Sequence, residues 1–199
     1  MLYFGTDSNG FQNPFALFRV SNTSITTPVE TFASLNDSTI EIDSAKFILT
    51  FNEDSITTGM IFYLFYFQEG GDSIFSESES NYLNITENDL NSTYVGSSRL
   101  SQKEPDSLGT TSFPTLSFNV SEILDSFSDT SSENRNLTVM IKPKFELAGV
   151  FSFKSSESGF TYAPQIQVFT HDTAFVDSTG DSVVVDTISH TFISTDDLS

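Results

Sequence analysis

Few side chains in this sequence are of the types that carry out catalysis. The chain has two histidines, His171 and His190, and no cysteine. Nucleophilic catalysis pairs a serine or cysteine with a base such as histidine, and zinc sites are built largely from cysteine and histidine ligands. The chain offers no cysteine for either arrangement and only two histidines, each with a simpler interpretation, so the sequence predicts no catalytic residues and a protein that is not an enzyme.

Both histidines have plain structural interpretations. His171 is followed by Asp172, a pair that could bind a metal ion, although a solvated loop is the simpler interpretation. His190 lies in an alternating pattern typical of a strand, and its side chain is expected at the surface or at an interface.

Hard oxygen ligands of the kind that Ca²⁺ accepts are clustered at two places in the chain. Neither cluster has the twelve-residue spacing of an EF-hand, and Asx-Gly sequences are also common turn formers. A structural Ca²⁺ and a simple turn therefore both remain open, and no other cofactor is predicted. The candidate ligands are Asp7, Asn9, Asp177 and Asp181.

Tyrosine rings are the candidates for stacking on sugars, because the chain has six tyrosines and no tryptophan. The segment 69–113 is long and polar, and we expect it to form a loop. Tyr82 and Tyr94 lie within it and are the best glycan-binding candidates. The alternative is that they anchor this loop to the domain.

The sequence contains short apolar runs bounded by Gly, Pro, Asn and Ser. These runs predict β-strands, which would position the candidate side chains named above. After Val120, the residues Ile123, Leu124 and Phe127 recur at a spacing that suits one or two turns of helix. Pro164 cannot donate to a β-ladder, so its strand is expected to begin there or to lie at an edge. The expected strands are 2–4, 15–20, 38–42, 45–51, 60–67, 82–85, 115–120, 137–141, 149–153 and 164–170.

Seven stretches of the sequence, most of which overlap the expected strands, together form the pattern of a known family. They are Leu2 to Asp7, Phe15 to Val20, Ile42 to Leu49, Phe118 to Leu124, Leu137 to Ile141, Phe153 to Glu157 and Ala163 to Val168. Their order resembles the DNRLRE family, disaggregatase-related β-sandwich modules that are classed with carbohydrate-binding modules. The resemblance implies an antiparallel, jelly-roll-like β-sandwich over roughly residues 2 to 170. It implies no catalytic residues, because the family has no single catalytic set.

Composition supports the same fold class. The chain has 199 residues, of which 37% are hydrophobic, enough for one domain with a substantial core. It contains 21 phenylalanines, so packing of these rings has to provide much of the stability in the absence of disulfides. We therefore expect an all-β, antiparallel sandwich over 1–170 with a long loop at 69–113 and very little helix.

The C-terminal segment 171–199 lies beyond the family-like region and is expected to form a hairpin and one further strand. These strands either extend the same sheet or form an arm that pairs with a neighbouring subunit by strand addition. An arm predicts that removing 171–199 leaves a folded domain. The interface candidates are Phe175, Val183, Val185, Ile188, His190 and Phe192.

The net charge of −19 limits the partners that the chain can bind. Nucleic-acid binding is not expected, because contacts to phosphates need cationic side chains. Membrane insertion is not expected either, because the longest apolar run, 60–67, is far shorter than the roughly 20 residues of a spanning helix. The first residues also lack the basic and apolar regions of a secretory leader.

Two functional hypotheses fit these features. The first is a non-enzymatic structural protein of a virus particle, such as a phage capsid decoration, head-fibre or tail-associated protein. It would be homo-oligomeric, located in the virion, and in contact with capsid proteins or neighbouring subunits. The alternative is a carbohydrate-binding or adhesive module of a secreted bacterial surface protein, located outside the cell and bound to surface glycans.

Overall fold

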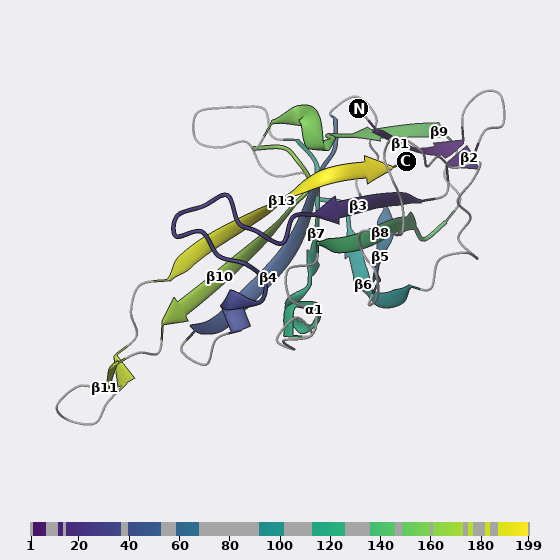
Figure 1. Ribbon diagram of the computed structural model, residues 1–199. Helices are drawn as coiled ribbons and strands as arrows, with labels where there is room; N and C mark the ends of the chain where they lie inside the picture. The colour runs from purple at the N-terminus through teal and green to yellow at the C-terminus, as the bar shows by residue number, and fades with distance from the viewer. Residues whose placement is uncertain are drawn as a thin grey trace, which may run out of the picture.

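The regular structure in this chain is almost entirely antiparallel β-strand (Figure 1). The computed structural model describes residues 2–6, 12–13, 15–36, 40–52, 59–67, 92–101, 113–125, 136–145, 149–159, 161–172, 175–176, 182–183 and 187–198. The strands are β1 (Leu2–Thr6), β2 (Gln12–Asn13), β3 (Ala16–Val20), β4 (Ile40–Thr50), β5 (Ile61–Tyr66), β6 (Thr93–Arg99), β7 (Thr115–Asn119), β8 (Leu137–Pro143), β9 (Gly149–Phe153), β10 (Gln165–Asp172), β11 (Phe175–Val176), β12 (Ser182–Val183) and β13 (Ile188–Leu198). The helical elements are η1 (Ser34–Asn36), α1 (Ser121–Asp125) and η7 (Ser156–Ser158).

Eight strands form one main sheet in the order β6-β5-β8-β3-β13-β10-β4-β7. Its two outermost strands approach each other, because Ser101, just after β6, pairs with Thr115 at the start of β7. The sheet is therefore nearly closed, and its two halves face each other across the core. The expected all-β, antiparallel fold with little helix is confirmed.

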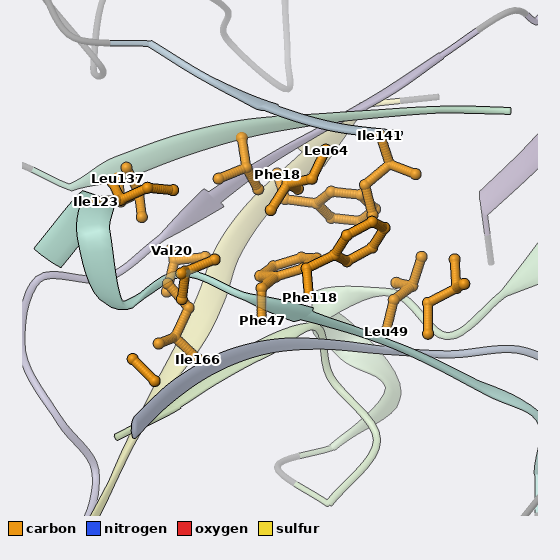
Figure 2. Packing of buried hydrophobic residues seen from close by; sticks show 14 of the residues in the cluster. Phe18, Val20, Phe47, Leu49, Leu64, Phe118, Ile123, Leu137, Ile141 and Ile166 are labelled. Carbon is orange, nitrogen blue, oxygen red and sulfur yellow. The ribbon is translucent and has the colours of Figure 1, made fainter. Parts of the chain in front are cut away.

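The core between the two halves is built largely from phenylalanine. The rings of Phe18 on β3 and Phe47 on β4 lie 5.8 Å apart, and those of Phe51 and Phe62 lie 5.7 Å apart. Figure 2 shows these halves meeting, with Phe18 and Leu64 on one side and Phe47 on the other. Alternation along β4 explains the pattern, because Phe47 is buried while Lys46 is exposed.

The apolar run around β5 is buried on the inner face of the sheet and partly buried on the outer face. Phe62 and Leu64 point into the main core. Phe65 points the other way, against a second cluster on the outer side of the sheet formed by Phe15, Leu17, Phe67 and Met140. Two-sided burial explains why this strand reads as a continuous apolar run instead of an alternating one.

The long strand β13 joins the two halves of the sheet. Its first part, from Ile188 to Ile193, pairs with β10, and its last part, from Ser194 to Leu198, pairs with β3. The pairing shifts register between Ser194 and Asp196, where the strand passes from one half to the other. Figure 1 shows β13 running beside β10 and then bending toward β3.

Residues 188–198 are therefore part of the domain's own sheet. This agrees with the interpretation that the C-terminal strands extend the same sheet. Removing 171–199 would take out an inner strand with partners on both sides, which argues against the expectation that a folded domain remains. Within the described part of 171–199, the β11–β12 hairpin is not paired with the main sheet, and Figure 1 shows β11 well away from the body.

A separate three-stranded sheet in the order β2-β1-β9 flanks the main one. Its link to the core is a bridge between Phe51, just after β4, and Phe153 at the end of β9. The Phe153 ring packs edge-on against Phe18 at 5.4 Å. The N-terminal strand thus pairs with β9, and β9 contributes a ring to the main core.

Most expected strands lie within a few residues of the observed ones. Expected strands 38–42 and 45–51 are one continuous strand, β4, and β10 begins directly after Pro164, as expected. The segment 69–113 is not all loop, because residues 93–99 form the edge strand β6. The expected strand at 82–85 lies outside the described residues.

We expect Phe18→Ala to lower the free energy of unfolding by about 3–5 kcal/mol, because Phe18 is fully buried and its loss leaves a cavity beside the rings of Phe47 and Phe153. Denaturation in urea would measure the change. The control is Val29→Ala, since Val29 is 64% exposed and should change stability by less than about 0.5 kcal/mol. Equal losses for the two variants would contradict this assignment of the core.

Candidate functional site

An aromatic group lies on the outer face of β5 and β6. Tyr63 and Phe65 point outward because their neighbours Phe62 and Leu64 fill the core. Tyr94 of β6 is paired with Phe65 across the two strands. Its ring lies 5.8 Å from the Tyr63 ring and 5.6 Å from the Phe65 ring, both edge-on. This group of three rings is called the aromatic face below.

Tyr94 is the most accessible member of the aromatic face, with 55% of its surface exposed. Tyr63 and Phe65 are partly buried and hold the Tyr94 ring from two sides. An aromatic ring fixed in this way offers an apolar surface at low entropic cost, which suits the apolar face of a sugar or of another side chain. Tyr82, the second glycan candidate, lies outside the described residues.

His171 has carboxylate neighbours on the adjacent strand β4. Its Nδ1 lies 2.7 Å from Oδ1 of Asp43, and its Nε2 lies 3.3 Å from Oε2 of Glu41. The partners of His171 are thus cross-strand acids, which the strand register brings together. No group of three or more metal-ligating side chains is found within the described ranges.

His190 is buried and not at the surface as expected, with only 2% of its area exposed. The loop between β3 and β4 covers it, since Ile25 N–H donates to the Thr191 carbonyl beside it. Nε2 lies 3.2 Å from the Thr170 hydroxyl, while Nδ1 has no hydrogen-bond partner. Burial lowers the pKa of His190, and nearby Glu30 and the Pro28 carbonyl offset part of this effect.

Phe192 is also part of the chain's own core. Its ring stacks on Phe32 at 4.3 Å, and the side chain is fully buried. His190 and Phe192 therefore face the interior of this chain, and neither side chain is accessible to a neighbouring subunit. Ile188, at the start of β13, is partly exposed.

Asp197 near the end of β13 is a buried carboxylate that sequence reasoning missed. Its Oδ2 accepts a 2.6 Å hydrogen bond from the backbone N–H of Ser156. Burial raises the pKa of Asp197, and the hydrogen bonds from Ser156 act in the opposite direction. The contact ties the end of β13 to the η7 turn after β9, a structural role that a run of polar residues in the sequence does not reveal.

The remaining candidate residues lie in segments where the structure describes few residues. Phe175 and Val183 are paired with each other in the β11–β12 hairpin. Five of the other candidates lie outside the described residues: Asp7, Asn9, Asp177, Asp181 and Val185. The Ca²⁺ site therefore stays a prediction.

Comparison with known proteins finds no matching family model, no similar curated protein and no similar solved structure. The resemblance to DNRLRE modules accordingly remains an expectation from sequence. Among the helices that the structure describes, none is long and apolar enough to span a membrane.

We expect acid to destabilise the fold partly through His190. Because burial lowers its pKa below 6.5, the unfolded chain binds this proton more readily, and the folded state loses stability as the pH falls below that value. His190→Gln removes the titrating group. When the pH is lowered from above 6.5 to below it, the unfolding free energy of this variant should therefore fall less than that of the wild type.

Urea denaturation at the two pH values measures this difference. Thr170→Val is the matched control, because it removes the hydrogen-bond partner and keeps the imidazole, and should retain the pH dependence of the wild type. Asp197 is present in all three chains, so its contribution cancels in the comparison. Equal pH dependence of wild type and His190→Gln would contradict the prediction.

Proposed function

We propose that this chain is a non-enzymatic structural protein of a virus particle, such as a phage capsid decoration, head-fibre or tail-associated protein. The observation that carries the proposal is the β11–β12 hairpin, which stands away from the nearly closed sheet (Figure 1). A two-stranded ribbon leaves both outer edges without strand partners, and such edges favour pairing with another chain.

The rest of the fold suits a scaffold that carries such a ribbon. The hairpin is inserted between β10 and β13, two inner strands that are paired with each other from Gln165–Ile193 to Thr170–Ile188. Both ends of the hairpin therefore lead into inner strands of the main sheet. The net charge of −19 is consistent with a soluble protein that needs specific contacts to associate.

We expect the chain to co-migrate with a major capsid protein and nucleic acid in density-gradient fractions from the native source. Mass spectrometry of the fractions would measure the ratio of the two proteins. A fixed ratio across the particle peak supports a virion component. Detection only in soluble or cell-surface fractions would exclude it and favour the adhesive alternative.

A hairpin variant tests whether this element is the attachment point. Replacing 172–186 by Asn-Gly keeps the Thr170–Ile188 register and leaves a two-residue turn between His171 and Thr187, suited to an antiparallel connection. The variant should retain the circular dichroism and cooperative unfolding of the full chain but disappear from the particle fractions. Normal incorporation would show that attachment lies elsewhere.

A carbohydrate-binding or adhesive module is the second candidate, and the aromatic face favours it. Tyr94 is exposed and held in place by two neighbouring rings. Neutral or host-surface glycans are the candidate ligands, because an anionic polysaccharide would be repelled by a protein of this charge unless Ca²⁺ bridged the two.

If the module binds glycans, Tyr94→Ala should weaken binding by about fivefold or more, since loss of one stacked ring costs about 1–3 kcal/mol where aromatic side chains stack on nucleic-acid bases. Glycan-array binding followed by calorimetry on the hits would measure the loss. Tyr162→Ala is the control, because Tyr162 is an exposed tyrosine that packs on Phe113, away from the aromatic face. Equal binding by wild type and Tyr94→Ala would remove Tyr94 as a ligand.

A further inference from the structure

The segment that follows β3, residues 21–31, runs along the side of β13 that faces away from β10 (Figure 1). Ile25 N–H donates to the Thr191 carbonyl, and the Thr191 N–H donates to the Thr26 hydroxyl oxygen. β3 cannot supply these bonds, because it pairs only with the last part of β13. The segment 21–31 therefore takes the place of a neighbouring strand here, and it is called the strap below.

The strap also covers His190 on the inner face of β13. The imidazole is only 2% exposed, and the strap residues Pro28 and Glu30 are close enough to act on it. Its Nε2 lies 3.2 Å from the Thr170 hydroxyl, while its Nδ1 has no hydrogen-bond partner. A proton on this ring would place a charge where water cannot reach it, and burial outweighs the favourable effects of Glu30 and the Pro28 carbonyl.

The charges around the imidazole come from one side only. Glu30 is the one titratable residue in the sequence of the strap. On β10, Thr170 contacts the imidazole, so the next residue, His171, points to the opposite face of the sheet, together with its partners Glu41 and Asp43 of β4. Within the described ranges, Glu30 is thus the charged group that acts on the buried ring.

The strap buries few apolar side chains of its own. Ile25 and Val29 are 46% and 64% exposed, and Pro28 is exposed as well. The apolar anchor comes directly after the strap, where the Phe32 ring stacks on Phe192 at 4.3 Å. Segments with few buried apolar contacts open at a lower free energy than the core does. The strap can therefore open while Phe32 stays in place.

We propose that the strap is an acid-released cover: protonation of His190 opens residues 21–31 while the rest of the sheet stays folded. Opening lets water reach the charged ring, so the open form takes up the proton more readily and gains population as the pH falls. It also frees the backbone N–H and carbonyl of Thr191, and this side of β13 then becomes available for pairing with another strand.

Amide hydrogen exchange of the full chain, followed by NMR, tests the proposal. Protection of the Ile25 amide is expressed relative to an unstructured peptide at the same pH, which removes the intrinsic pH dependence of exchange. It should fall by up to about tenfold for each pH unit below about 6.5. The reference is the Val120 N–H, which donates to the Ala45 carbonyl in the main sheet and should lose much less protection.

Two variants assign the effect to the imidazole. His190→Gln should remove the pH dependence of protection at Ile25, whereas Thr170→Val keeps the ring and should retain it. The wild type gives a second readout that does not depend on how well a variant packs. The protonated fraction of His190, read from the carbon signals of its ring, should rise together with the exchange-competent fraction of Ile25.

Three outcomes would overturn the proposal. Equal loss of protection at Ile25 and Val120 would show that acid unfolds the whole domain and not the strap. A ring that becomes protonated while Ile25 stays protected would show that the closed form accommodates the charge. Loss at Ile25 that persists in His190→Gln would assign the opening to another group. None of these outcomes bears on the particle experiment, so the two proposals fail separately.

Discussion

The packing of phenylalanine rings between the two halves of the sheet is the interaction on which the rest of the structure depends. Phe18, Phe47 and Phe153 come from three different strands and meet at centroid distances below 6 Å. Edge-on and tilted ring contacts of this kind fix the distance between sheet layers as well as burying apolar surface. With no disulfide in the chain, this packing is what holds β9 and its small sheet against the main one.

The second requirement is that one strand serves both halves. β13 satisfies backbone hydrogen bonds of β10 with its first part and of β3 with its last part. The change of partner coincides with the register shift between Ser194 and Asp196, in the polar stretch after Ile193. Ser194 donates from its hydroxyl to the Arg19 carbonyl, and Asp197 accepts from Ser156. Polar side chains at this corner thus replace the apolar contacts that a regular strand would make.

Sequence patterns predicted the strands whose inner faces alternate, such as β4, because burial of every second residue leaves a clear period of two. They missed β6, since this edge strand directs Tyr94 outward and has few apolar residues to mark an inner face. The strand pattern near the C-terminus covers only Ile188 to Ile193, whereas β13 continues to Leu198, because its last residues are held by backbone pairing and a buried carboxylate. Tyr94 could be chosen from the sequence alone. Its neighbours could not, since Tyr63 and Phe65 join it only through the strand register.

The order of strands in the sheet has a consequence for how the chain folds during synthesis. β3, residues 16–20, pairs on one side with β13, residues 188–198, so one of its edges has no partner until about 170 further residues have been translated. The same holds for the edge of β10 that β13 covers. Contacts this distant in sequence close slowly, and unpaired edges expose nascent chains to aggregation. The main sheet therefore closes only when β13 inserts between β3 and β10.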